Sequence, residues 1–268
     1  MPVLGIDYEK CSGCGTCLVS CLRPGYYFKR TEDYETIIYE DPDKSCILCG
    51  QCIGQCPEDA IMYENMGEAF TFKNVESPQE IVSYEDAFHF LTANRSVRHY
   101  KKDKVPLEVL KKVFKAMQYA PTGANRRSER FSIISNNDKL TAISDAVYEE
   151  LKGGEQFRLQ LDLLKKSYQA PVFFDAPHVI FVTNTSKGAL AGCNIGIIVT
   201  YGRLAAQALG LGTCWVGMMQ LAIEFQPKIK KLANIRGSIV GAFAIGYPDL
   251  KYYRVPPRAE KKTVGLEE

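Results

Sequence analysis

Eight cysteines near the start of the chain have a spacing that suits iron–sulfur clusters. They form two runs of the pattern C-x2-C-x2-C-x3-C, namely Cys11, Cys14, Cys17 and Cys21, then Cys46, Cys49, Cys52 and Cys56. Three thiolates two residues apart can wrap one cubane cluster, whereas the fourth points away from it. Zinc is a weaker explanation, because a zinc site needs four ligands and does not account for the longer last spacing. The runs therefore predict two 4Fe-4S clusters.

Residues 1–72 as a whole resemble bacterial two-cluster ferredoxins, in which the fourth cysteine of each run ligates the other cluster. This resemblance implies one cluster on Cys11, Cys14, Cys17 and Cys56 and a second on Cys46, Cys49, Cys52 and Cys21. A strand over 3–8 and a hairpin over 26–39 are expected around the cysteines, so each half is a strand plus a cysteine run. One departure is that Leu22 follows Cys21, whereas Pro57 follows Cys56.

Three later stretches carry groups that could bind a phosphate-bearing planar cofactor. Residues 94–100 place two arginines and a serine within four positions, and guanidinium groups match phosphate oxygens bidentately. Residues 120–127 present the Asn125 amide, which offers donors and an acceptor to the polar edge of a flavin. Glycines in 210–217 permit close backbone approach to a ring. Taken singly, each stretch also has a structural explanation. Residues 94–100 could be an exposed basic loop, residues 120–127 a connecting loop, and the glycines in 210–217 could serve tight helix-to-strand packing.

Together, these stretches are similar to the FMN-dependent nitroreductase family over residues 84–258, and the whole architecture resembles ferredoxin-fused nitroreductases. The resemblance implies that FMN is bound by Arg95, Ser96, Arg98, Asn125, Arg127, Trp215, Val216, Gly217, Arg254 and Arg258. In this resemblance, Arg95, Ser96 and Arg98 hold phosphate or ribityl oxygens of FMN, and Asn125 contacts the pyrimidine edge of the flavin. Residues 215–217 lie against the flavin near N5. Arg254 matches a phosphate-binding arginine, with Arg258 as a possible substitute for a basic residue at Tyr252.

The same resemblance has consequences for catalysis and assembly. It implies no catalytic side chain, because hydride transfer takes place at flavin N5. It also implies an intertwined homodimer with two FMN molecules at the subunit interface. The chain departs from the family where Asn94 replaces a frequent arginine and where Arg126-Arg127-Ser128 replaces the usual x-Gln-Pro.

The remaining elements predict an α+β domain over 84–268, joined to the first domain by a polar linker at 73–83. Strands are expected at 131–134, 179–183, 214–218 and 239–245, and helices at 138–151, 155–169 and 189–209. Two further helices are expected, one from Tyr84 and one from Pro106. We interpret their apolar stripes, which include Ala87, Phe88 and Leu91 in the first helix, as core. Cys193 and Cys214 are expected to be buried.

Composition and charge limit the possible partners and location. The chain has 46% hydrophobic and 24% charged residues, with neither a secretion signal nor a membrane span, so a cytoplasmic protein is expected. Residues 1–72 hold 5 Lys+Arg against 12 Asp+Glu, while the remainder holds 28 against 19. An acidic and a basic domain attract each other, and a basic cleft suits a phosphate-bearing cofactor, although solvated surface charge explains the values equally well. No nucleic-acid-binding motif is present.

These features favour an enzyme, a flavin-dependent oxidoreductase. The substrate would be a small electron-poor molecule of nitroaromatic or quinone type, reduced with electrons relayed through two 4Fe-4S clusters. No G-x-G-x-x-G follows a strand, so reduced ferredoxin or another one-electron donor is favoured, while NAD(P)H stays open. The alternatives are the same cofactors acting on an activated C=C bond or in another specialised redox step, or a non-catalytic electron-transfer or redox-sensing module.

Overall fold

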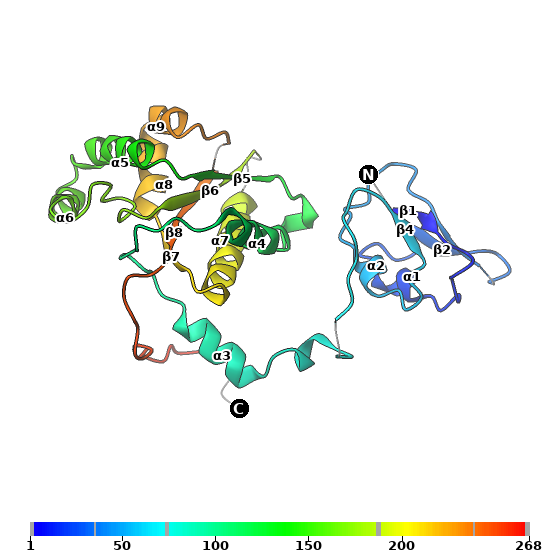
Figure 1. Cartoon of the computed structure of the whole chain (residues 1–268). Coiled ribbons are helices and arrows are strands. Elements are labelled where there is room, and N and C mark those ends of the chain that lie inside the picture. The colour runs from blue at the N-terminus through cyan, green and yellow to red at the C-terminus, as the bar shows by residue number, and fades with distance from the viewer. Residues whose placement is uncertain (1–2, 35, 73–74, 186–188, 238, 266–268) are drawn as a thin grey trace. The chain divides into compact units, whose positions relative to one another are not determined.

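The computed structural model describes residues 3–34, 36–72, 75–185, 189–237 and 239–265 (Figure 1). The chain divides into two compact units. The first comprises Met1–Ile81 with Gly123–Arg126, and the second comprises Val82–Thr122 with Arg127–Glu268. Among the described residues, no helix has the length and apolar character needed to cross a membrane.

The first unit consists of two small antiparallel sheets and short helices. Its strands are β1 (Val3–Ile6), β2 (Phe28–Arg30), β3 (Ile37–Tyr39) and β4 (Ile61–Tyr63). Its helices are α1 (Thr16–Ser20), α2 (Gln51–Gly54) and the 3-10 helices η1 (Pro78–Glu80) and η2 (Gly123–Asn125). β1 pairs with β4, and β2 pairs with β3 as the predicted hairpin.

Each of the helices α1 and α2 begins directly after the second cysteine of a run. Their N-caps are Gly15 and Gly50, with φ values of +79° and +74°. Glycine reaches this left-handed region without a Cβ penalty, so the chain can turn sharply and enter the helix. The third cysteine of each run, Cys17 or Cys52, then lies within the helix and is buried.

The second unit is a four-stranded antiparallel sheet with helices on both faces (Figure 1). Its strands are β5 (Glu129–Ile134), β6 (His178–Asn184), β7 (Gly212–Trp215) and β8 (Ile239–Gly246), in the order β5-β6-β8-β7. Its helices are α3 (Tyr84–Ala93), α4 (Leu107–Gln118), α5 (Asn137–Leu151), α6 (Glu155–Lys165), α7 (Ala189–Ala208), α8 (Gly217–Phe225) and α9 (Pro227–Leu232). The predicted α+β class is confirmed.

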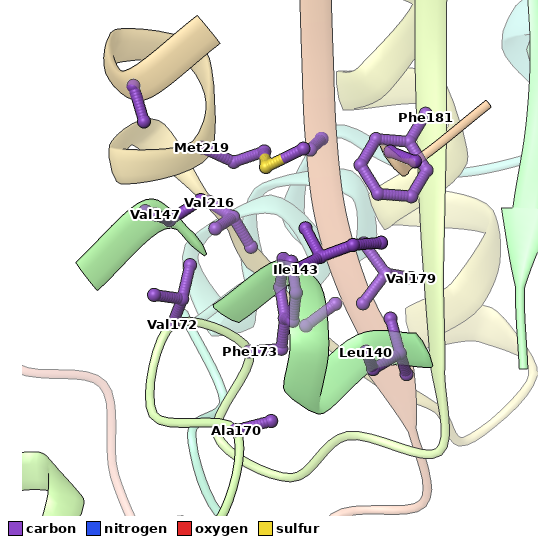
Figure 2. Packing of buried hydrophobic residues seen from close by; sticks show 14 of the residues in the cluster. Leu140, Ile143, Val147, Ala170, Val172, Phe173, Val179, Phe181, Val216 and Met219 are labelled. Atoms are coloured by element: carbon purple, nitrogen blue, oxygen red, sulfur yellow. The ribbon is translucent and has the colours of Figure 1, made fainter. Parts of the chain in front are cut away.

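The central strand β6 is buried on both faces. Val179 and Phe181 pack with α5 and α8 on one face, where Ile143 of α5 lies close to the strand (Figure 2). Ile180 and Val182 pack with α4 and α7 on the opposite face. Successive strand residues point to opposite faces, so covering both faces requires an uninterrupted apolar run rather than alternation.

Two of the predicted elements are only partly right. The strand predicted at 214–218 ends at Trp215, and Gly217 begins α8, which was not predicted. A short apolar run does not distinguish a strand from a buried helix by periodicity, and here the run contains the end of one and the start of the other. The helix predicted over 155–169 ends at Lys165.

The interpretation of the α3 stripe as core is wrong. No residue of α3 is buried, and the side chains of Tyr84, Phe88 and Leu91 are 75%, 50% and 55% exposed. The expectation for the two later cysteines is half wrong, because Cys214 is buried whereas Cys193 is exposed on α7. An amphipathic pattern predicts that one face of the helix packs against apolar side chains, but it does not predict that those side chains belong to the same chain.

A buried histidine ties β6 to the segment before α4. Val105 N donates to Nε2 of His178 at 3.0 Å, so that nitrogen carries no proton, and Nδ1 lies 2.6 Å from the Ser135 hydroxyl oxygen. Burial, assisted by the charge of Lys104, lowers the pKa of His178. Protonation would remove the acceptor that Val105 uses.

The free energy of unfolding of the second unit should therefore fall in mild acid. The unfolded chain binds a proton near pH ~6.5, above the folded pKa of His178. The contribution of neutral His178 to the free energy of unfolding is complete above the pKa of the unfolded chain. It is lost as the pH falls from that value to the folded pKa, and a further fall in pH changes it no more. Urea unfolding, followed by the fluorescence of Trp215, the only tryptophan, should show this loss. His178→Gln keeps an acceptor and should lose less stability between about pH 7.5 and 5.5; an equal loss in both proteins would contradict the assignment.

Candidate functional site

Four thiols from both halves of the first unit surround one hollow. The hollow is lined by Cys11, Cys14, Cys17 and Cys56 together with apolar side chains that include Ile6, Ile37 and Ile61. Burial raises the pKa of the Cys17 thiol, and the neighbouring thiols of the same four raise it further. Ala60 N donates to Cys56 Sγ at 3.3 Å, and the Thr16 hydroxyl lies 3.3 Å from Cys14 Sγ, to which it would donate once the thiol is ionised.

The other four thiols also lie together. Burial raises the pKa of Cys52 to about 12, with further contributions from Cys46, Cys49 and Cys21. In the part of the chain that the structure describes, no three His, Cys, Asp or Glu side chains converge as ligands of one metal ion. A cubane cluster instead spreads its thiolates around a larger body, and each set offers four thiols in largely apolar surroundings. Both sets fit such a cluster.

The exchange of the fourth cysteine follows from the two helices. Cys21 is the C-cap of α1, and Cys56 follows the C-cap of α2. Each helix therefore starts in one thiol set and delivers its last cysteine to the other set. The structure thus brings together the two groups of four that the ferredoxin resemblance implies, and their role as ligands stays a prediction.

In the second unit, the arginine-rich segment 94–100 runs beside β7. Ser96 forms a parallel bridge with Thr213, and Val97 N donates to Thr213 O at 2.9 Å. Two of the three stretches predicted from the sequence therefore meet, although more than 100 positions separate them. An extended segment points alternate side chains to opposite sides, so Ser96 and Arg98 share one side and Arg95 takes the other.

On the Ser96 side, two guanidinium groups surround a buried thiol. Burial raises the pKa of Cys214, while the charges of Arg98 and Arg203 oppose the shift. The thiol donates to Trp215 O at 3.5 Å. Arg203 extends from α7 and donates from Nε to the Thr213 hydroxyl oxygen at 3.2 Å. Among the described residues, neither guanidinium pairs with a carboxylate. Arg98 is exposed and Arg203 is half-buried. Guanidinium groups donate charge-assisted hydrogen bonds to anions, so this side of β7 offers a candidate anion site.

The loop between α6 and β6 holds Arg98 in place. The Tyr168 hydroxyl donates to Arg98 O at 3.1 Å and lies 3.1 Å from Nδ1 of His99. The Arg98 Cζ atom lies 5.7 Å from the centre of the Phe174 ring, a cation–π distance. Phe174 and Asp175 have φ values of +57° and +51°, and such backbone strain recurs where a structure positions functional groups.

Arg95 does not join this anion site. It lines a separate cavity of about 240 Å³ with Asn94, Gln207 and Tyr252 among the other lining residues. Asn94 Nδ2 donates to Gln207 Oε1 at 2.7 Å, which ties the start of the segment to α7.

Asn125 and Arg127 belong to different units and have other contacts. Asn125 packs with the first unit, where its Nδ2 donates to Ile47 O at 3.0 Å and to Leu48 O at 2.6 Å. Arg127 donates from Nη2 to Gln118 O at 3.1 Å and lines a cavity of about 410 Å³ in the second unit.

The remaining predicted flavin residues differ in burial. Trp215 packs against the core on the α7 side of the sheet, Val216 is buried on the other side, and Gly217 is exposed at the start of α8. Arg254 and Arg258 are exposed in the irregular segment after β8.

Reasoning from the sequence missed Arg203, Tyr168 and Phe174. A signal existed for Arg203, because it is the only charged residue in the long apolar helix α7. Such a lone charge must find a polar partner when the helix is buried. Nothing in the local pattern distinguishes Tyr168 or Phe174 from other loop aromatics.

Comparison with known proteins agrees with this division of the chain. The model of the Nitroreductase family matches residues 91–247, and a 4Fe-4S dicluster domain model matches residues 10–61. An iodotyrosine deiodinase of Thermotoga neapolitana is 25% identical over 170 residues, which cover 58% of this chain and 84% of that protein. The FMN reductase (NAD(P)H) of Bacillus subtilis is 28% identical over 171 residues, covering 56% and 63%.

A solved structure supports the fold. The crystal structure of a nitroreductase with bound FMN from Bacteroides fragilis superposes with a TM-score of 0.55 at 21% identity, covering 68% of this chain and 96% of that one. The family model spans more than half of the chain, within the unit that holds the sheet and the anion site. The chain therefore belongs to the Nitroreductase family and carries a 4Fe-4S dicluster domain ahead of its nitroreductase domain.

Proposed function

We propose that this flavin-dependent oxidoreductase reduces a small electron-poor organic substrate with electrons that pass through two 4Fe-4S clusters. Its cofactors are FMN and the two clusters. The observation that carries the proposal is the combination, in one chain, of two four-thiol sets with two guanidinium groups that have no carboxylate partner among the described residues. Each cluster passes one electron at a time, and a flavin collects two and delivers them as hydride.

Within the second unit, Ser96, Arg98 and Arg203 would hold the FMN phosphate. Guanidinium groups donate charge-assisted hydrogen bonds to phosphate oxygens, and the neighbouring loop keeps Arg98 at a fixed place beside Phe174. The backbone of 215–217 would lie near the reactive edge of the ring, as the family resemblance implies. Asn125, Arg127, Arg254 and Arg258 remain candidates for further contacts.

A cavity beside this segment suits the substrate. It has a volume of about 590 Å³, within the usual range for small-molecule sites. Its lining includes Tyr168, whose hydroxyl donates to Arg98 O. Lys102, Lys165 and Lys166 also line it. Ammonium groups stabilise negative charge that develops on nitro or quinone oxygens during reduction, so the lining favours these classes.

The exposed apolar face of α3 supports a homodimer. Tyr84, Phe88 and Leu91 stay exposed in the single chain, and a second copy could cover them. This agrees with the intertwined dimer that the resemblance implies. The electron donor that we favour remains a reduced ferredoxin or another one-electron donor, with NAD(P)H as the alternative.

Anaerobic purification tests the proposal when it is followed by addition of a nitroaromatic, a quinone, an enone and a haloaromatic, each tested for reoxidation of the reduced flavin. The protein should contain about eight Fe and one FMN per chain. After reduction, a nitroaromatic or a quinone should reoxidise the flavin, taking two electrons and two protons per nitro group reduced to nitroso or per quinone reduced to hydroquinone. Thr141→Trp, which narrows the cavity, should keep FMN and lose this reoxidation.

The panel also separates the rival functions. Reoxidation by an enone alone would indicate reduction of an activated C=C bond, and reoxidation by a haloaromatic alone would indicate the specialised step that the named deiodinase relatives suggest. A protein that holds both cofactors but reacts with no member of the panel would be an electron-transfer or redox-sensing module. A chain without flavin after mild purification would refute the proposal.

A further inference from the structure

The hydroxyl group of Tyr39, at the end of β3, has no hydrogen-bond partner. Its oxygen atom is inaccessible to solvent, and among the described residues no donor or acceptor lies within hydrogen-bond limits. A buried hydroxyl without a partner loses its hydrogen bonds to water and gains none in return, which destabilises the folded state. Buried polar groups are almost always satisfied, so this hydroxyl points to a partner that is not a protein atom.

The surroundings of the hydroxyl identify that partner. Burial raises the pKa of Tyr39, and the next contributions come from the Cys46 thiol and Asp41, with Cys52 also contributing. Cys46 and Cys52 belong to the second thiol set. Tyr39 also packs in the same apolar cluster as Cys21, Cys46 and Cys52. Its hydroxyl is therefore close enough to Cys46 for the thiol to influence its pKa, but it meets no regular hydrogen-bond geometry with a described residue, and it lies beside the position of the second cluster.

The hairpin fixes the direction of the Tyr39 side chain. Tyr39 pairs with Phe28 across the β2–β3 ladder, and the two ring centres are 5.0 Å apart. The ring of Tyr27 lies 6.4 Å away on the same hairpin. The Tyr27 hydroxyl is engaged elsewhere, 2.9 Å from the Ser45 hydroxyl oxygen. Of these two neighbouring tyrosines, only Tyr39 has a hydroxyl available to the cluster.

We propose that Tyr39 donates a hydrogen bond to sulfur of the second cluster and thereby raises the reduction potential of that cluster. A donor to cluster sulfur stabilises the reduced state, which carries more negative charge, and the effect is larger away from water. The inference rests on the two clusters of the proposed function, but it requires neither FMN nor a substrate.

The first cluster has its own donor, which provides a matched comparison. The Thr16 hydroxyl lies 3.3 Å from Cys14 Sγ, and Cys14 is exposed. Thr16→Val removes this hydroxyl at nearly constant volume. Tyr39→Phe and Thr16→Val thus remove one hydroxyl each, beside different clusters.

A redox titration of the reduced clusters by electron paramagnetic resonance tests the proposal. Tyr39→Phe should lower the midpoint potential of the second cluster and leave that of the first unchanged. Thr16→Val should lower the midpoint potential of the first cluster only. Tyr27→Phe, which removes a hydroxyl that already has a protein partner, should shift neither. Iron content near eight per chain shows that each variant keeps both clusters.

Two outcomes would overturn the proposal. One is a Tyr39→Phe protein with full iron and both midpoints unchanged, and the other is an equal shift of both midpoints. Should the phenylalanine variant not assemble its clusters, 3-fluorotyrosine at position 39 keeps the hydroxyl and makes it a stronger donor. With 3-fluorotyrosine, the midpoint potential of the second cluster should rise. An unchanged midpoint would refute the hydrogen bond. Loss of FMN or of substrate reduction alters none of these measurements.

Discussion

Cys56→Ala should leave the chain with about four Fe in place of about eight, because a cubane needs all four thiolates. The lost cluster is the one on Cys11, Cys14 and Cys17, although Cys56 belongs to the second cysteine run. Electron transfer from a one-electron donor to the flavin should fall with it, while FMN content should stay unchanged. Iron assay, flavin assay and the spectrum of the reduced protein measure the three effects.

A second cysteine provides the control for this variant. Cys193 is exposed on α7 in the second unit, outside both thiol sets, and Cys193→Ala should keep both clusters. Cys21→Ala should remove the other cluster, on Cys46, Cys49 and Cys52. A Cys56→Ala protein that retains all of its iron would show that Cys56 is not a required ligand. Loss of the cluster on Cys46, Cys49 and Cys52 instead would show that the two runs do not exchange their fourth cysteines.

Arg98→Ala should weaken FMN binding by about 1.5 to 3 kcal/mol, or roughly 10- to 150-fold, through loss of a charge-assisted hydrogen bond to phosphate. Arg203→Leu should produce a loss of similar size, since the two guanidinium groups flank the same thiol and neither has a carboxylate partner among the described residues. Because they share one ligand group, the double variant should depart from additivity. Titration of the apoprotein with FMN, followed by flavin fluorescence, measures each dissociation constant.

Arg130→Ala serves as the matched control, because Arg130 is exposed on β5 and lies in a different part of the second unit. It should bind FMN as the unaltered protein does. Raising the salt concentration should weaken FMN binding less in the Arg98 and Arg203 variants than in the unaltered protein. An unchanged dissociation constant for Arg98→Ala would remove the phosphate assignment from this segment.

The thiol sets and the anion site differ in how far they could be predicted. Both cysteine runs are local patterns, and a cluster demands its ligands at short fixed spacing, so the donor residues are visible in the chain itself. The anion site joins Ser96 and Arg98 to Thr213 and Arg203. Only the first two stand in one motif, and Arg95, in the same motif, turns to the opposite side because the segment is extended.

The errors have a common physical cause. The stripe of α3 is amphipathic as predicted, but its apolar face stays exposed in the single chain. Residues 214–218 are apolar as a strand requires, yet Gly217 starts a helix. Periodicity reports which side chains avoid water, and it contains no information on which element or chain covers them.

By itself, the sequence predicted the α+β class and the candidate donor thiols for two clusters, because periodicity and ligand spacing are properties of neighbouring residues. The family followed from the resemblance of three combined stretches. Only the tertiary structure brought Arg203 to the same side of β7 as Arg98, placed Tyr168 and Phe174 against that arginine, and buried the Tyr39 hydroxyl beside Cys46 and Cys52 with no hydrogen-bond partner among the described residues. Such contacts join positions far apart in the chain, and they arise from the packing of whole elements rather than from any local pattern.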